Sequence, residues 1–202
     1  MSRSKLDEVL ERIQELEREL SQELEELLQE KQQQFRYRLE KGKAKFEKGV
    51  ASLQRRRRVG LFRYLFGAEL KHLLTSPVIY SLIIPFTLLD LWVTIYQHVC
   101  FRAYGIPRVK RREYIVIDRH RLAYLNLLEK INCVYCGYVN GVIAYVREVA
   151  GRTEQYWCPI KHARVTASFH PHTHEFTDFG DAEAYRDKLV HLRSALSKLS
   201  SE

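Results

Sequence analysis

The first apolar positions of the chain recur with the spacing of a coiled coil. Successive apolar residues are 3, 4, 3 and 4 positions apart, and then 4 and 3 positions apart: Leu6, Val9, Ile13, Leu16, Leu20, Leu24 and Leu27. The second consecutive step of four is a stutter in the heptad repeat. The intervening positions are mostly Glu, Gln and Arg, without Gly or Pro over residues 5–30. This pattern predicts a coiled-coil helix, through which the chain forms homo-oligomers or binds a protein partner.

A second apolar stripe follows, and it predicts more helix. Its members are Phe35, Leu39, Phe46, Val50 and Leu53. Gly42 and Gly49 lie within this stretch, and glycine weakens a helix.

Two further segments are apolar enough to involve a membrane. Residues 59–76 are amphipathic at helical spacing, which predicts a helix lying at a membrane interface. Residues 77–101 form a run of 25 residues, long enough to cross a bilayer. The alternative for this run is a buried helix of a soluble protein. Asp90 would be costly in hydrocarbon, so we expect it to face a partner, water or another subunit.

The charge of the chain changes sign just before these segments. Residues 1–30 hold ten acidic and four basic side chains, whereas residues 31–58 hold two acidic and eleven basic ones. The basic part ends in a run of four arginines: Arg55, Arg56, Arg57 and Arg58. Attraction to anionic lipid is on the order of 1 kcal/mol per basic residue near the surface. Because the run adjoins an apolar segment and has no interleaved aromatic residues, we expect membrane lipid as its partner, and no nucleic acid.

Basic residues on both sides of the apolar run leave its topology open. A single span would place one cluster outside, against the positive-inside tendency. A hairpin bent at Pro85, or a pair of short tilted helices, would keep both clusters and both termini in the cytoplasm, which is the predicted arrangement. The N-terminus lacks an apolar stretch of the kind found in signal peptides, so we expect no cleaved signal.

The remaining residues, 105–202, predict a small helical domain. Residues 112–120 are expected to be extended, and Asp118 can cap a helix that begins at about Arg119. Residues 121–151 fit a helix that Gly137 and Gly141 break or allow to pack closely, and that Gly151 ends. A new helix is expected within 152–163, and an amphipathic helix over 181–199, with an apolar stripe of Leu189, Leu192, Leu196 and Leu199.

Two short sequences carry the chemistry that this domain suggests. "CVYCGY" (133–138) and "WCPIKHA" (157–163) place Cys133 three residues before Cys136, and Cys158 four residues before His162. Whether on loops or on two antiparallel helices, these spacings permit a closed Cys3His site. Mixed sulfur and nitrogen ligands favour structural zinc, with an iron–sulfur cluster as the alternative. A redox dithiol and ordinary packing of buried thiols are the other interpretations.

The sequence "FHPHTHEF" offers a second, weaker candidate metal site. His170, His172 and His174 alternate, so in a strand they would share one face, whereas in a loop they would be solvated. The chain has no H-E-x-x-H motif, phosphate loop or nucleophile elbow. The sequence therefore predicts a protein that is not an enzyme.

The cysteine sequences resemble the knuckles of rubredoxin and zinc-ribbon proteins. Lys161 stands where that pattern has its fourth cysteine, and the intervening residues are apolar and helix-forming. Over roughly 85–165 the chain also resembles an uncharacterised family of proteobacterial membrane proteins, with no assigned function, through "YGIPRV", "DRHRLAYLNLLEKINCVYCGYVNG" and "RTEQYWCPIKHA". This resemblance implies a bacterial membrane location.

Together these patterns predict a mostly α protein in three parts. Residues 1–58 form a coiled-coil arm, residues 59–104 a membrane segment, and residues 105–202 a cytoplasmic domain with a Cys/His site. The predicted function is that of a metal-binding assembly or adaptor protein anchored in the bacterial inner membrane, with the bulk of the chain cytoplasmic. A membrane redox protein that uses an iron–sulfur centre or the Cys-x-x-Cys dithiol is the alternative.

Overall fold

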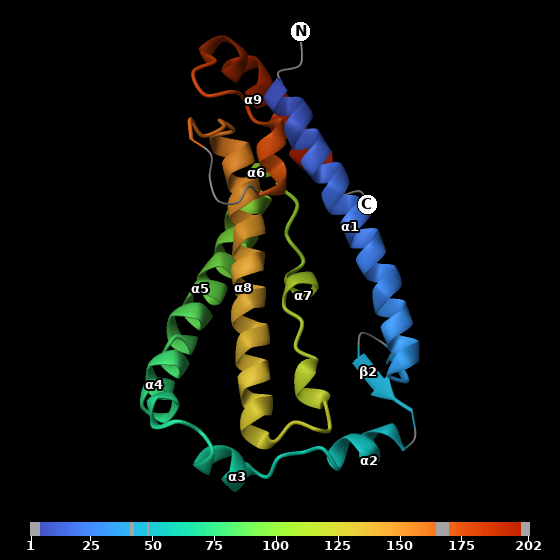
Figure 1. Ribbon diagram of the computed structural model, residues 1–202. Helices are drawn as coiled ribbons and strands as arrows, with labels where there is room; N and C mark the ends of the chain where they lie inside the picture. Colours follow the sequence, from blue (N-terminus) through green and yellow to red (C-terminus); the bar gives the residue numbers. More distant parts are fainter. Residues whose placement is uncertain (1–4, 41–42, 48, 165–169, 199–202) are drawn as a thin grey trace. The chain divides into compact units, whose positions relative to one another are not determined.

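The computed structural model describes residues 5–40, 43–47, 49–164 and 170–198, and they are mostly helical, as predicted (Figure 1). The α-helices are α1 (Lys5–Gln34), α2 (Val50–Arg55), α3 (Leu61–Phe66), α4 (Leu70–Ser81), α5 (Ile83–Tyr96), α6 (Arg102–Tyr104), α7 (Arg111–Tyr114), α8 (Leu127–Trp157) and α9 (Ala182–Lys198). The shorter elements are strands β1 (Tyr37–Glu40) and β2 (Lys43–Phe46), the π-helical turn η1 (Gln97–Phe101), and the 3₁₀ turns η2 (Arg119–Arg121) and η3 (Pro171–Glu175).

The chain divides into two units, each of which collects segments that are distant in sequence. The first unit contains the described residues of Met1–Glu23, Leu91–Lys110 and Ala144–Glu202. The second contains those of Leu24–Asp90 and Arg111–Ile143. Helices α1, α5 and α8 each contribute one end to each unit. The division into 1–58, 59–104 and 105–202 follows the sequence patterns and remains a prediction.

In the second unit, α1 is followed by a β-hairpin, so the helix predicted from Phe35 to Leu53 is wrong for most of its length. Arg36 has a φ of 52°, a left-handed conformation that ends the helix. Strands β1 and β2 then pair antiparallel, with Tyr37 opposite Phe46 and their ring centroids 5.7 Å apart. The spacing of Tyr37 and Leu39 is the period of two that a strand requires, and only α2 retains the expected helix.

The predicted interfacial helix over 59–76 is divided into two pieces. Helix α3 ends at Phe66, Gly67 caps it, and α4 begins at Leu70 after an extended Glu69. Residues 70–76 therefore belong to the longer apolar helix that follows.

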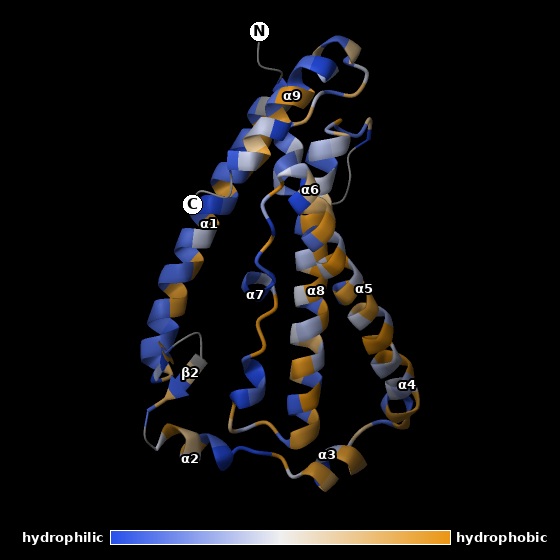
Figure 2. Ribbon diagram, turned by 180° about the vertical axis from the view of Figure 1, so that it is seen from behind, coloured by the Kyte–Doolittle hydropathy of each residue, from blue (hydrophilic) through white to orange (hydrophobic). Residues whose placement is uncertain are grey.

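That apolar helical run extends from Leu70 to Tyr104, through α4, α5, η1 and α6, and it is long and apolar enough to cross a membrane. At 1.5 Å per residue its 35 residues span about 52 Å, compared with about 30 Å for a hydrocarbon core. Only 6% of its most apolar stretch of 18 residues is buried. Figure 2 shows α4 and α5 as largely hydrophobic, whereas α1 is largely hydrophilic.

The chain does not reverse direction at Pro85, so the predicted hairpin is wrong. Every residue from 70 to 104 is described, and the helical run passes through this position. Pro85 is the third residue of α5. In the first turn of a helix the missing N–H of proline removes no helical hydrogen bond.

Helix α8 begins later than predicted because a capping box fixes its start. The Glu129 N–H donates to Asn126 Oδ1 at 3.0 Å, and the Asn126 N–H donates to Glu129 Oε2 at 2.8 Å. This reciprocal pair satisfies two backbone donors that a helix start leaves without partners. The predicted start at Arg119 is only the turn η2, and Asp118 makes no side-chain capping bond there within the described residues.

Helix α8 then continues without a break for 31 residues, which corrects the predicted end at Gly151 and the predicted new helix after it. Its glycines serve close packing instead. A Cβ atom on Gly141 would lie 2.7 Å from the Ile115 Cα, so only glycine lets the extended chain cross the helix there. Cys158 and Pro159 follow directly after the helix end, and proline cannot continue a helix.

The last predicted helix is confirmed as α9 in the first unit. Leu189, Leu192 and Leu196 of its apolar stripe are buried, and Leu199 lies outside the described residues. Phe101 and Tyr145 are also buried in this unit.

Candidate functional site

In the first unit, two histidines of the segment before α9 pack against the last turns of α8. His170 Nε2 lies 2.8 Å from Glu154 Oε2, and His172 Nε2 lies 3.1 Å from Glu148 Oε1. Gly151 lies beneath both rings, where a Cβ atom would come within 3.1 Å of each. The glycine that was expected to end the helix therefore makes room for the imidazoles.

Glu148 is the electrostatic centre of this cluster. Its side chain is 11% exposed, and it also accepts a hydrogen bond from Arg152 Nε at 2.7 Å. Burial alone would raise the pKa of the Glu148 carboxyl, but the hydrogen bonds from His172 and Arg152 outweigh burial and lower this pKa to about 2. Arg152 Nη1 also donates to the Pro107 carbonyl at 2.8 Å, so the ion pair ties a third segment of the unit to α8.

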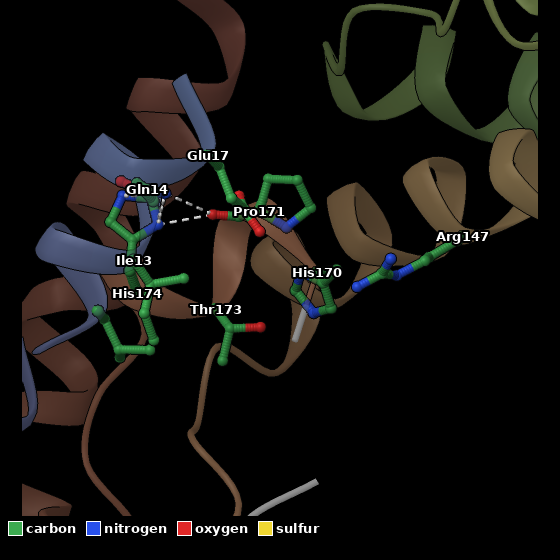
Figure 3. Close-up of a pocket in the computed structure, with 9 residues that line it drawn as sticks. Ile13, Gln14, Glu17, Arg147, His170, Pro171, Thr173 and His174 are labelled. Atoms are coloured by element: carbon green, nitrogen blue, oxygen red, sulfur yellow. Dashed lines mark hydrogen bonds between the residues drawn. The ribbon is translucent and has the colours of Figure 1, made fainter. Parts of the chain in front are cut away.

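The third histidine faces α1 and borders a small pocket (Figure 3). His174 Nδ1 lies 2.7 Å from Gln14 Nε2, which also donates to the Pro171 carbonyl at 3.1 Å. Arg147 extends from α8 toward His170 in the same view. The pocket has a volume of about 260 Å³ and is lined by Leu10, Ile13, Gln14, Glu17, Arg147, His170, Pro171, Thr173 and His174.

This geometry favours a structural role over the second metal site predicted at His170, His172 and His174. The three histidines form a clamp that fastens the segment before α9 to α8 and α1. Each imidazole has a different partner, namely Glu154, Glu148 and Gln14. Among the described residues, no group of three or more His, Cys, Asp or Glu side chains is placed to hold a metal ion. The side chains are only 16%, 14% and 26% exposed, so the alternative of freely solvated histidines does not describe them either.

The structure does not bring together the four residues of the predicted Cys3His site. Cys133 and Cys136 lie on α8, whereas Cys158 and His162 follow its C-terminal end. Cys133 and Cys136 belong to the second unit and Cys158 and His162 to the first, and the unbroken helix α8 leaves no loop between Cys136 and Trp157. All four cysteines of the chain are free, and Cys136, Cys158 and His162 are exposed. A zinc or iron–sulfur site remains a prediction.

In the second unit, Asp90 has the partner that its place in an apolar helix requires. Arg111 Nε donates to Asp90 Oδ1 at 2.8 Å, and Arg111 Nη2 donates to Oδ2 at 2.5 Å. The Tyr138 hydroxyl donates to Oδ2 at 2.9 Å. Asp90 itself is 7% exposed. A bidentate pair with an additional hydroxyl donor leaves this carboxylate well satisfied.

Arg111 is one of the basic residues that follow the apolar run, and neither its pairing with Asp90 nor the contribution of Tyr138 was predicted. A signal was available, because an acidic residue in an apolar segment requires a cationic partner. Arg111, 21 residues further along the chain, is that partner. Gln97 was also overlooked, although it is 2% exposed within the apolar helix. In the first unit, Gln97 Oε1 accepts a hydrogen bond from the Val109 N–H at 3.0 Å, and Gln97 Nε2 donates to the Tyr145 hydroxyl at 2.5 Å. The predicted lipid-facing arginines Arg55, Arg56, Arg57 and Arg58 are all exposed.

No family model, curated protein or solved structure matches the chain. The resemblances noted in the sequence therefore rest on the quoted residues alone and remain predictions.

Removing Arg111 should destabilise the second unit, because it leaves the Asp90 carboxylate without its cation. We expect Arg111→Gln to lower the free energy of unfolding by roughly 1–3 kcal/mol, which is less than a fully buried pair would lose because the arginine is 43% exposed. Thermal unfolding in one detergent would measure the loss. Its neighbour Arg112 is exposed, so Arg112→Gln is the matched control. Adding Asp90→Asn to Arg111→Gln should restore part of the loss, and a double variant no better than the single one would contradict this pairing.

Acid should weaken the first unit through Glu148. A carboxyl whose pKa is lowered from 4.5 to about 2 contributes stability above about pH 4.5, and this stability is lost as pH falls through about 2. We expect Glu148→Gln to be less stable than wild type at neutral pH and to lose less stability between pH 4.5 and 2. Hydrogen exchange of the amides in 170–176 would follow the opening of the clamp. The exposed Glu183→Gln should behave like wild type, and an equal pH slope in all three proteins would refute the role of Glu148.

Proposed function

We propose that the protein is a membrane-anchored assembly protein that dimerises through α1. The helical run Leu70–Tyr104 is the anchor, and the apolar stripe of α1 meets the same stripe of a second copy. The observation that carries the proposal is that both apolar surfaces are uncovered in the described chain.

The anchor is supported by the exposure of the run and by the segment before it. Fully burying a large aliphatic or aromatic side chain gains about 1.5–3 kcal/mol relative to leaving it in water. Leu74, Val78 and Trp92 are 69%, 69% and 74% exposed, so a bilayer would remove a large cost. Helix α3 exposes Phe62 and Phe66 directly after the four arginines, the combination of apolar and basic side chains that suits a membrane interface.

The dimer is supported by the stripe on α1. Its apolar members Val9, Ile13, Leu16, Leu20, Leu24 and Leu27 are between 42% and 65% exposed. The next position round the helix, Leu10, is 6% exposed and belongs to the core of the first unit. The helix thus packs on its own unit mainly through Leu10, and although Ile13 also borders the pocket of that unit, the heptad stripe stays largely exposed for another helix.

Charge and geometry favour a parallel pair of copies. In the heptad register that places Ile13 at a and Leu16 at d, Arg12 is a g position and Glu17 the following e position. In a parallel coiled coil, g and e residues of opposite charge attract across the seam. Anchoring in one membrane also confines copies to one surface, which raises their effective concentration and allows a short coiled coil to suffice.

The proposal predicts that a cysteine placed in the seam, where the apolar stripes of two α1 helices meet, forms a disulfide between the two copies in carbonate-washed membranes. In a chain whose four native cysteines are serine, Leu16→Cys should cross-link under mild oxidation. The outward-facing Ser21→Cys is the matched control and should not. Adding Leu20→Asp should abolish the cross-link, whereas adding Gln22→Asp should leave it intact, because only the first charge enters the seam.

Two results would overturn the proposal separately. Recovery of the protein in the carbonate wash would refute the anchor. Membrane-bound protein that cross-links equally through positions 16 and 21 would refute the dimer. Residues 1–30 carry a net charge of −6 in each copy, so cross-linking should increase with salt, which screens repulsion between the arms.

A further inference from the structure

The second unit contains an apolar cavity that the proposed function does not use. It has a volume of about 480 Å³, within the range of small-molecule sites, and it lies between α3, α4 and α8. Leu65, Leu73 and Leu128 contribute carbon surface, and Cys136 of α8 lines it as well.

Several of the polar groups that border this cavity are paired with the protein itself. The Tyr80 hydroxyl donates to Asn132 Oδ1, and the Tyr135 hydroxyl donates to the Ile79 carbonyl at 2.8 Å. The two tyrosine rings meet edge to face, with centroids 5.9 Å apart. Because these tyrosines and Asn132 already have partners and most of the lining is apolar, the wall offers a ligand mainly carbon. A hydrocarbon chain gains from such a wall, whereas a polar ligand would exchange its hydration for few hydrogen bonds.

The stretch of chain that supplies two walls of the cavity is strongly basic. Residues 55–72 contain six Lys or Arg and one acidic residue. Arg63 of α3 and Lys71 of α4 are exposed next to cavity-lining residues in the sequence. The four arginines before α3 are exposed as well. A ligand with a hydrocarbon tail and a negatively charged head would complement both features.

We propose that this cavity holds an acyl chain of an anionic membrane phospholipid, with the phosphate headgroup bound by the basic side chains of 55–72. The inference rests on the proposed membrane anchoring, since the lipid reaches the cavity from the bilayer to which α4 belongs. A bound chain joins α3 and α4 to α8 through a dry apolar contact. The protein thereby distinguishes anionic from zwitterionic membranes.

The test uses the thiol that lines the cavity. In detergent-purified Cys133→Ser protein, a water-soluble maleimide should label Cys136. Dioleoyl phosphatidylglycerol at about ten times its Kd should slow this labelling about tenfold, because only the unoccupied fraction reacts. Dioleoyl phosphatidylcholine should slow it much less. Cys158, which is exposed outside this cavity, serves as the internal reference.

A filled cavity provides the second measurement. Ser76 lines the cavity and Thr75 does not, so Ser76→Phe should fill it and Thr75→Phe is the matched control. Native mass spectrometry should find one retained phospholipid on wild type and Thr75→Phe, and at least about tenfold less on Ser76→Phe. Similar unfolding temperatures would show that both variants fold.

The outcomes separate this inference from the proposed function. If the protein stays in the membrane in a carbonate wash, but Cys136 of the detergent-purified protein reacts at the same rate with and without added phosphatidylglycerol, the cavity site is refuted. Equal protection by both lipids refutes the headgroup assignment. Protein that leaves the membrane in a carbonate wash refutes the anchor itself, whatever Cys136 does.

Discussion

An uncovered apolar helix is the constraint on which the rest of this structure depends. The run from Leu70 to Tyr104 has almost none of its most apolar window buried by the described chain. Water is a poor solvent for such a surface, since each large apolar side chain left exposed forgoes about 1.5–3 kcal/mol. In the proposed anchoring a bilayer removes that cost, and α3, which exposes Phe62 and Phe66 shortly after four arginines, would lie at the membrane interface. The run is therefore long and apolar enough to cross a membrane, which is the basis of the proposed anchor.

The polar groups along this helix are satisfied within each unit. In the second unit, Asp90 is paired with Arg111. In the first unit, the side chain of Gln97 bonds to the backbone of Val109 and to Tyr145. Unsatisfied polar groups are expensive in an apolar medium, so these contacts allow a helix with polar residues to tolerate hydrocarbon. The same contacts fasten neighbouring segments to it without requiring a large apolar core between them.

The elements that sequence predicted well are those decided by local pattern. The heptad stripe on α1 and the final helix follow from the spacing of apolar residues, and the long apolar run follows from its length and composition. The failures come from tertiary context: Gly151 is a packing position rather than a helix end, because another segment packs against α8 there, whereas at Gly141 close packing was one of the two expectations. That single helix also separates Cys136 from Cys158, which spacing alone could not reveal. Asp90 was recognised as needing a partner, but a contact across 21 residues leaves no periodic signal that identifies Arg111.

The most direct test of membrane anchoring is to measure whether Trp92 lies within the bilayer. This side chain is 74% exposed on α5, and Trp157 is the other tryptophan of the chain. With Trp157→Phe, the fluorescence of Trp92 can be measured in vesicles whose acyl chains carry bromine. Bromine quenches at short range, so a membrane anchor predicts strong quenching by the brominated lipid and weak quenching by acrylamide in water. Strong quenching by acrylamide, with none by the brominated lipid, would show that this helix does not enter the membrane.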